Sequence, residues 1–281
     1  MSNIPFALVN GLAADSVAVT DRGLAYGDGL FETVQLRAGR PLLLNQHFER
    51  LCLGCSRLGI DSGGLTERLT RDIEHLARLR DLQPFGVLKL IVTRGTGGRG
   101  YLAAPDMTPT RILLLSPLPD YPDDPAQAGV RVRLCDMTLA LNPRLAGIKH
   151  LNRLEQVLAR NEWHDPLIRE GLLRDSEGFL VEGTMSNLLW VRAGRLYTPL
   201  LDRCGVAGVL RDRLLVLATD VGIQVHQGRF GLSELEQADE VLLCNSLIDI
   251  WPVVALEDRH WPVGPVTQRL QNLLTEDYRA C

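Results

Sequence analysis

The segment that decides how the chain is divided reads Pro117-Leu118-Pro119-Asp120-Tyr121-Pro122-Asp123-Asp124-Pro125. Proline recurs along it and lacks the backbone N–H that a β-ladder needs, so the segment is unsuited to the interior of a sheet. Such a stretch is typical of a linker between domains. We therefore expect a small N-terminal α/β domain over residues 1–116, a linker over 117–125 and a larger C-terminal domain over 126–281.

The residues before the linker alternate between strand-like and helix-like patterns. Apolar residues at helical spacing predict two helices, over 46–58 and 65–79. Short apolar runs bounded by turn residues predict strands over 6–9, 17–19, 31–36, 41–44, 85–93 and 111–116. A glycine-rich loop over 94–101 follows the strand expected over 85–93 and leads to the one expected over 111–116.

The residues after the linker show the same mixture. Strands are expected over 130–135, 171–174, 179–183, 187–191, 223–227, 240–244 and 250–255. Helices are expected over 151–161, 209–221, 233–237 and 267–278. The whole chain is therefore predicted to be a two-domain α/β protein of the α+β type.

Composition excludes several classes of function. The 281 residues are 46% apolar and 23% charged, with a net charge of −4, as in an ordinary globular protein. No basic block favours nucleic acid or an anionic membrane. No stretch has the apolar length of a membrane span, and the N-terminus does not resemble a secretory signal. We expect a cytoplasmic protein that binds neither nucleic acid nor membrane.

The cysteines do not predict a metal site. Cys52 and Cys55 have the Cys-x-x-Cys spacing, but they fall inside the apolar pattern of the helix expected over 46–58. Buried thiols explain that placement better than a redox or zinc pair. Since no second ligand pair with metal spacing is visible, no metal is expected.

Lysine is nearly absent, which draws attention to Lys149. Lys89 and Lys149 are the only lysines, and arginine supplies the remaining positive charge. An amine that attacks a carbonyl group cannot be replaced by a guanidinium, whereas a solubilising cation can. Lys89 fits a strand whose charged residue faces outward. Lys149 follows turn residues and is our candidate nucleophile, although from composition alone it can equally be a solvated helix start.

A lysine of this kind suggests pyridoxal phosphate, whose aldehyde forms an imine with an amine. That cofactor also needs an anion site. The segment 205–211 leads from a glycine turn into a helix-like pattern, and helix N-termini bind phosphate. Asn245 and Ser246 offer further donors after an apolar strand. Each of these segments can also be a purely structural turn.

Two further requirements are an acid for the pyridine nitrogen and an anchor for the substrate. Glu182, at the end of the strand expected over 179–183, can keep that nitrogen protonated, although an acid at a strand end is often only solvated. Arg99 and Tyr101, in the glycine-rich loop, can bind a carboxylate, although such a loop can also be merely exposed. The loop lacks the Lys-Ser/Thr ending of a Walker phosphate loop.

Four blocks of the sequence resemble a known family. The chain resembles the fold-type IV pyridoxal-phosphate enzymes, which include branched-chain and D-amino-acid aminotransferases and aminodeoxychorismate lyases. The stretches 93–101 and 145–158 are similar to the lyases in particular. The four matching blocks, in chain order, are Asp21 to Thr33, His47 to Leu51, Gly147 to Glu155 and Glu182 to Leu188.

The resemblance implies roles for individual residues. Lys149 matches the cofactor-bound lysine, Glu182 the partner of the pyridine nitrogen and Arg50 a phosphate ligand. Val209 and Leu210 match helix-start residues whose N–H groups bind phosphate. Ser246, next to Asn245, matches a hydroxyl ligand. Two positions depart from the aminotransferases: Leu210 stands where they often have threonine, and Arg153 and Leu154 occupy the neighbourhood of a tyrosine that branched-chain enzymes have.

The resemblance also implies an activity. It suggests a lyase that forms 4-aminobenzoate and pyruvate from 4-amino-4-deoxychorismate in folate biosynthesis, with the cofactor between two domains of a homodimer. Arg99, Tyr101 and Thr33 would then bind a small-molecule substrate that carries two carboxylates. The alternative is a D-amino-acid or branched-chain aminotransferase of the same fold, which would need a 2-oxo acid. A non-catalytic relative should lack the lysine, the arginine or the glutamate, and this chain has all three.

Overall fold

The computed structural model describes residues 6–82, 86–121 and 123–280. Phe85, in the strand predicted over 85–93, and Pro122, in the predicted linker, lie outside these ranges. The chain forms two compact units, Met1–Pro119 with Ile148–Asn152 and Asp120–Gly147 with Arg153–Cys281. The units divide the expected linker, with residues 117–119 in the first unit and 120–125 in the second. They also include Ile148–Asn152 in the first unit, whereas the expected division assigns Lys149 to the C-terminal domain.

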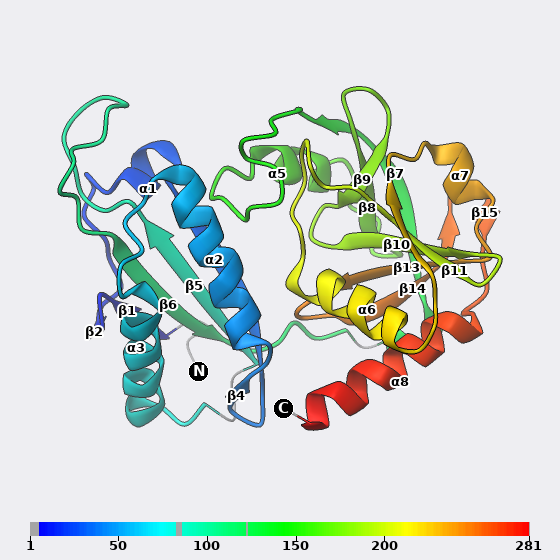
Figure 1. Ribbon diagram of the computed structural model, residues 1–281, viewed down its shortest axis with the longest axis horizontal. Helices are drawn as coiled ribbons and strands as arrows, with labels where there is room; N and C mark the ends of the chain where they lie inside the picture. Colours follow the sequence, from blue (N-terminus) through cyan, green and yellow to red (C-terminus); the bar gives the residue numbers. More distant parts are fainter. Residues whose placement is uncertain (1–5, 83–85, 122, 281) are drawn as a thin grey trace. The chain divides into compact units, whose positions relative to one another are not determined.

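The first unit contains an antiparallel sheet with helices on one face (Figure 1). The strand order is β2-β1-β6-β5-β3-β4. The strands are β1 (Phe6–Val9), β2 (Leu12–Ala13), β3 (Gly29–Arg37), β4 (Arg40–Pro41), β5 (Val87–Thr93) and β6 (Thr110–Ser116). The helices are α1 (Arg22–Tyr26), α2 (Leu44–Leu58) and α3 (Leu65–Leu79).

Packing in this unit follows the apolar pattern of the sequence. On α3 the predicted face of Leu69, Ile73 and Leu76 is buried, and α2 packs on β3 through residues such as Leu51. The strand expected over 17–19 is wrong, because Asp21 caps the start of α1 shortly after it and Val19 is 84% exposed. An isolated apolar run has no partner strand there.

The segment Ile148–Asn152 completes the edge of β3. The N–H of Phe31 donates to the carbonyl oxygen of Lys149 at 2.9 Å, and the N–H of Leu151 donates to that of Gly29 at 3.0 Å. An isolated bridge between Leu30 and His150 lies between these two bonds. Since the next helix begins only at Leu154, Lys149 is not at a helix start, and that alternative from the sequence is wrong.

The second unit contains a nine-stranded mixed sheet in the order β12-β11-β10-β13-β14-β7-β8-β9, with β15 beside β14. β9, at the end of this order, also pairs with β10 through Glu182 and Asn187. The strands are β7 (Val130–Leu139), β8 (Ile168–Asp175), β9 (Leu180–Gly183), β10 (Asn187–Arg192), β11 (Arg195–Pro199), β12 (Val225–Gly228), β13 (Glu240–Asn245), β14 (Asp249–Leu256) and β15 (Arg259–His260).

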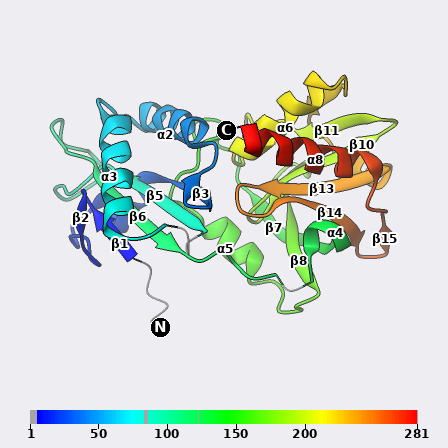
Figure 2. The same ribbon diagram turned by 90° about the horizontal axis from the view of Figure 1, so that it is seen from below.

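Apolar side chains fill this sheet and helices flank it. Trp190 and Trp251 lie in one buried cluster, together with Leu188 and Val253. Helices α6 and α8 lie side by side (Figure 2). The helices are α4 (Pro125–Ala128), α5 (Leu154–Arg160), α6 (Val209–Asp220), α7 (Leu232–Glu236) and α8 (Pro265–Ala280).

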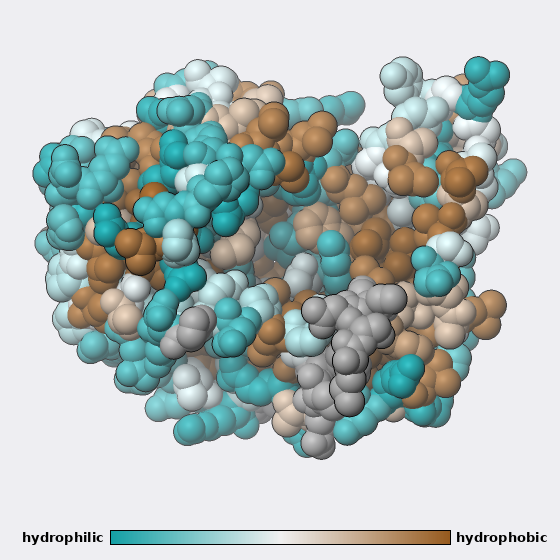
Figure 3. Space-filling model, turned by 180° about the vertical axis from the view of Figure 1, so that it is seen from behind, coloured by the Kyte–Doolittle hydropathy of each residue, from teal (hydrophilic) through white to brown (hydrophobic). Residues whose placement is uncertain are grey.

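The surface and the thiols agree with the composition. Within the described ranges, no helix combines the length and apolarity that a membrane span requires. Hydrophobic and hydrophilic side chains are interspersed over the face drawn in Figure 3. Cys52 and Cys55 both lie on α2 as free thiols, and burial raises the pKa of Cys55 to about 12, so this thiol stays protonated at neutral pH.

Candidate active site

Lys149 lies against an aromatic ring of β3. Its Nζ atom is 4.6 Å from the centroid of the Phe31 ring. Strand alternation places Phe31 and Thr33 on one face of the sheet and Glu32 on the other. The lysine main chain is held by the edge of β3, so the backbone that carries the amine is fixed by regular pairing.

Lys89, expected on the outward face of its strand, is half-buried on β5. Its Nζ atom is 5.1 Å from the same Phe31 ring, so both lysines of the chain contact one side chain. Lys89 is directly opposite Thr33 in the register of β3 and β5. Period-2 alternation gave its face, but only the pairing of strands more than fifty residues apart brings it beside Phe31.

Arg50 belongs to a buried cluster on the other face of β3. Its Nε atom donates to Oε1 of Glu32 at 2.9 Å, and a second bond joins the guanidinium to Oε2. Nδ1 of His47 lies 2.6 Å from the same Oε2 atom. Because His47 and Arg50 are three residues apart on α2, they face the strand together. Glu32 therefore fixes the orientation of Arg50.

Electrostatics determine the charges in this cluster. Burial raises the pKa of Glu32, but the Arg50 charge and the hydrogen bonds from His47 and Arg50 lower it to about 2, so the carboxylate is ionised. Burial lowers the pKa of His47, and the charges of Arg50 and Lys149 lower it further, against the opposing effect of Glu32. Arg50 is thus the cation that the ionised Glu32 holds, and His47 is neutral at neutral pH.

Glu182 is one of the buried acids of the second unit. It lies on β9 at the pair with Asn187 that joins β9 to β10. Its Oε2 atom accepts a hydrogen bond from the N–H of Val206 at 2.8 Å. Gly205 has a φ of +79°, and a Cβ atom there would lie 2.7 Å from Val181. The close approach of this glycine turn thus holds a donor against the carboxylate.

The turn leads into α6, where Val209 and Leu210 are the first two residues. Both side chains are buried, so only their backbone can meet a ligand. The first N–H groups of a helix have no partner within the helix and lie at its positive end. Gly208, which precedes them, approaches Asn187 so closely that a Cβ atom would lie 1.9 Å from Oδ1. The glycine turn and helix start expected over 205–211 are therefore present, and the anion site there stays a prediction.

Asn245 has a structural use. Its Oδ1 atom accepts hydrogen bonds from the N–H groups of Leu247 at 2.8 Å and Ile248 at 3.0 Å. Its Nδ2 atom donates to the carbonyl oxygen of Met185 at 3.0 Å. These bonds shape the turn that carries the half-buried Ser246, so Asn245 supports that turn rather than presenting a free carboxamide group.

Glu170 organises a neighbouring turn and was not found from the sequence. It is buried on β8 and accepts hydrogen bonds from the N–H groups of Thr184 at 3.0 Å and Met185 at 3.1 Å. It also accepts one from the hydroxyl of Ser186 at 2.8 Å. Glu170 stands just before the strand expected over 171–174, and its partners at Thr184, Met185 and Ser186 lie on a different part of the chain, so local sequence offered no signal for it.

The proposed substrate residues lie in the first unit. Thr33 is half-buried on β3, on the face that carries Phe31. Arg99 and Tyr101 are exposed on the loop between β5 and β6, and Tyr101 is 88% exposed. The ring of Tyr101 lies 5.5 Å from that of Tyr26 on α1, between centroids.

The chain belongs to the amino-transferase class IV family, which it matches over residues 29–256. Its structure superposes on that of 4-amino-4-deoxychorismate lyase from Pseudomonas aeruginosa with a TM-score of 0.91 and 50% identity, over 96% of this chain and 98% of that one. It is 34% identical to the aminodeoxychorismate lyase of Vibrio harveyi over 272 residues, 95% of this chain and 98% of that protein.

A more distant likeness defines the fold. The branched-chain amino acid aminotransferase from Escherichia coli superposes with a TM-score of 0.85 at 22% identity, over 98% of this chain and 94% of that one. At that identity the likeness shows the fold alone. The fold-type IV class, expected from four blocks of sequence, is confirmed.

Proposed function

We propose that this protein is a lyase that uses pyridoxal 5'-phosphate to convert 4-amino-4-deoxychorismate into 4-aminobenzoate and pyruvate. The observation that carries the proposal is the 50% identity to the Pseudomonas aeruginosa lyase over nearly the whole of both chains. The family match over residues 29–256 covers the segment with Lys149. The reaction would be a step of folate biosynthesis in the cytoplasm.

The chemistry of the available donors fits this cofactor. Its aldehyde needs an amine, which Lys149 supplies. Its phosphate needs cationic and N–H donors, and the family resemblance gives this role to Arg50, to the N–H groups of Val209 and Leu210 at the start of α6 and to the hydroxyl of Ser246. Its pyridine nitrogen needs an acid partner, and Glu182 is buried beside a backbone donor. When bound, pyridoxal phosphate supplies an electron sink for the carbon that bears the substrate nitrogen.

The chain's own residues then act on protons and charge. The freed amine of Lys149 removes the proton from the ring carbon that bears the nitrogen. The bond from the neighbouring carbon to the enolpyruvyl oxygen breaks, and the six-membered ring becomes aromatic. Lys149 returns a proton to the methylene carbon of enolpyruvate, which leaves as pyruvate. Glu182 would be the acid partner of the pyridine nitrogen when the cofactor is bound.

The substrate carries two carboxylates, and the first unit offers several donors for them. We propose Arg99, Tyr101 and Thr33 as substrate-binding residues. Lys89 joins them because it is opposite Thr33 in the sheet and its amine is held beside Phe31. A bidentate arginine contact gives the strongest of these anchors.

We also propose that the protein is a homodimer in which the loop carrying Arg99 reaches the partner's site. Two observations support an interface at this loop. Tyr101 is 88% exposed and Leu102 is 92% exposed. Large adjacent apolar side chains on a loop are commonly covered by a partner.

The test is to supply 4-amino-4-deoxychorismate to the purified protein without any 2-oxo acid and to measure 4-aminobenzoate. A lyase releases 4-aminobenzoate and pyruvate in equal amounts. An aminotransferase of this fold would turn over only when a 2-oxo acid is added together with a D-amino acid or a branched-chain amino acid. The second result would replace the proposed function with that alternative.

A further inference from the structure

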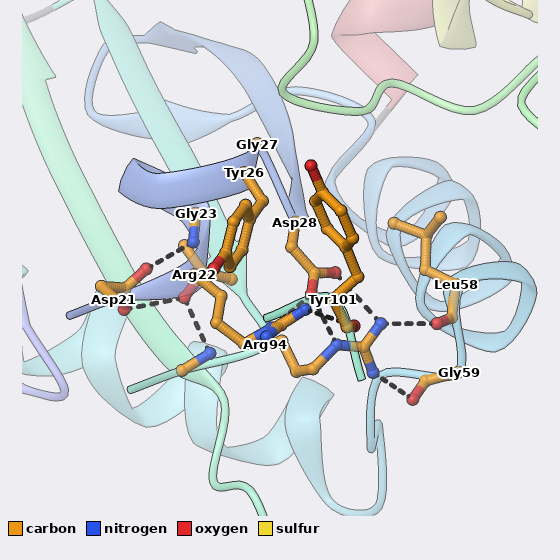
Figure 4. A network of polar contacts seen from close by, with 12 residues as sticks. Asp21, Arg22, Gly23, Tyr26, Gly27, Asp28, Leu58, Gly59, Arg94 and Tyr101 are labelled. Atoms are coloured by element: carbon orange, nitrogen blue, oxygen red, sulfur yellow. Dashed lines mark hydrogen bonds and ion pairs between the residues drawn. The ribbon is translucent and has the colours of Figure 1, made fainter. Parts of the chain in front are cut away.

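A carboxylate shared by two arginines lies at the base of the loop that carries Arg99 (Figure 4). Oδ2 of Asp28 accepts a hydrogen bond from Nε of Arg22 at 2.8 Å and one from Nε of Arg94 at 2.7 Å. A second bond of 3.0 Å joins Arg94 to Oδ1. Burial raises the pKa of Asp28, but its hydrogen bonds to both arginines and their charges bring it below its ordinary value. The carboxylate is therefore ionised at neutral pH.

Arg22 uses its two remaining nitrogens to hold the loop backbone. They donate to consecutive carbonyl oxygens, those of Gly100 and Tyr101, each at 2.9 Å. Its guanidinium also lies 4.8 Å from the ring centroid of Tyr26. The Tyr26 hydroxyl accepts a hydrogen bond from the N–H of Gly100 at 3.2 Å. One buried side chain of α1 and its neighbour thus fix the backbone between Arg99 and Tyr101.

Arg94 anchors the other end of the network. It donates to the carbonyl oxygens of Gly59 at 2.6 Å and Leu58 at 2.7 Å, at the C-terminus of α2. A cation is favourable at that end of a helix, where carbonyl groups lack partners. The loop is therefore tied through Asp28 to the helix that carries Arg50.

The loop has little order of its own. Glycine occupies positions 97, 98 and 100, and Gly100 has a φ of +90°. A Cβ atom at Gly98 or Gly100 would have nothing within 4 Å, so these two glycines are not packed against the rest of the unit. Residues 99–101 are held by the ring contact of Tyr101 with Tyr26 and by the donors that reach the backbone of Gly100 and Tyr101.

We propose that Arg22 is a positioning residue that sets substrate affinity by fixing the backbone on which Arg99 and Tyr101 are presented. This inference rests on the proposed function, in which these two side chains bind the carboxylates of 4-amino-4-deoxychorismate. The planar fork of Arg22 reaches Asp28 and two successive carbonyls at once. A lysine keeps the charge but cannot make these three directed contacts together.

The test compares Arg22→Lys with Arg111→Lys in the full-length protein loaded with pyridoxal phosphate. Arg111 is a matched control that lies on β6 of the same unit. Its Nε atom donates to Oδ2 of Asp72 at 2.7 Å, and its side chain does not touch the loop. The first readout is trypsin cleavage after Arg99, identified by the masses of the fragments 1–99 and 100–281. We expect Arg22→Lys to accelerate this cleavage by about tenfold relative to the parent protein, and Arg111→Lys to leave it unchanged.

The second readout separates binding from turnover. Arg22→Lys should raise the KM for 4-amino-4-deoxychorismate by about tenfold, change kcat by less than about threefold and leave the affinity for pyridoxal phosphate unchanged. Tyr26→Phe removes one contact without removing charge. It should raise both the cleavage rate and the KM by about twofold to threefold. Tyr26→Phe therefore still tests the proposal if Arg22→Lys does not fold.

The outcomes are distinct. Faster cleavage together with a higher KM supports the proposal. Unchanged cleavage in both loop variants overturns it, because Arg22 and Tyr26 then do not order the loop. Faster cleavage with an unchanged KM also overturns it and leaves the proposed function standing. A parent protein that releases no 4-aminobenzoate overturns the proposed function instead, while the trypsin comparison still decides whether Arg22 fixes the loop.

Discussion

The two units place their candidate cofactor residues by different means. In the first unit, charged side chains hold one another, as Glu32 holds Arg50 with two hydrogen bonds. In the second unit, glycine turns and main-chain groups do this work, as Val206 donates its N–H to Glu182. We call the candidate cofactor residues of the first unit the first group and those of the second unit the second group. The difference indicates that substitutions in the first group are limited by side-chain chemistry, whereas substitutions in the second group are limited by backbone shape.

The largest expected effect is on the first group. Lys149→Arg keeps the positive charge but should reduce turnover by orders of magnitude, because a guanidinium does not form the imine. Borohydride treatment followed by mass spectrometry should find cofactor fixed to Lys149 in the parent protein and none in the variant. Lys89→Arg is the control and should keep the label. A label on Lys89 in the parent protein would show that the wrong lysine was chosen.

The next effect tests the acid of the second group. Glu182→Gln preserves shape and removes charge, so pyridoxal phosphate should still bind while turnover falls by roughly 10²-fold or more, the scale of one positioned electrostatic group. Glu177→Gln, at an exposed carboxylate paired with Arg203 in the same unit, should leave turnover unchanged. Equal rates for Glu182→Gln and the parent protein would mean that another acid faces the pyridine nitrogen.

Acid should lower the unfolding free energy by protonating Glu32, which holds Arg50 in the first unit. Because its folded pKa of about 2 lies below its ordinary value of 4.5, the unfolded chain takes up the proton first. The stabilisation is therefore complete above pH 4.5 and is lost as the pH falls toward 2. A shift of this size corresponds to roughly 3 kcal/mol of unfolding free energy. Urea unfolding of the parent protein and Glu32→Gln across pH 7 to 3 measures it. Parallel curves for the two proteins would contradict the assignment.

The smallest effect tests backbone shape in the second group. Gly208→Ala places a methyl group 1.9 Å from Oδ1 of Asn187, so the turn before α6 must shift. We expect a loss of about 1 to 3 kcal/mol in unfolding free energy and weaker binding of pyridoxal phosphate. Gly98→Ala meets nothing within 4 Å and should leave the unfolding free energy unchanged. Equal stabilities for the two variants would remove the contrast between the two groups.

The same contrast determines what could be predicted from the sequence. Periodicity was enough for α2 and α3, because each buries a continuous apolar face against its own sheet. It failed at residues 17–19, where a short apolar run has no partner strand. The expected domain boundaries stay a prediction. The membership of Lys149 in the first unit depends on hydrogen bonds to β3, which local sequence does not encode.

Individual site residues follow the same rule. Lys149 and Glu182 could be proposed from residue type and local pattern. The position of Lys89 beside Phe31 could not, because it depends on the register between β3 and β5. The support that Asn245 and Glu170 give to distant turns was hidden for the same reason, since their hydrogen-bond partners lie many residues away. The roles assigned to the cofactor-binding and substrate-binding residues remain predictions for the experiments above.

The insertion of Ile148–Asn152 into the edge of β3 has a consequence for protein engineering. The chain leaves the first unit at Pro119 and returns to it for five residues before it continues through the second. A fragment that ends at Pro119 would leave the N–H of Phe31 and the carbonyl of Gly29 without these partners, on an open strand edge that promotes aggregation. Chimaeras between relatives should therefore exchange residues 1–119 together with 148–152, so that Lys149 and the strand that holds its backbone are inherited from one parent.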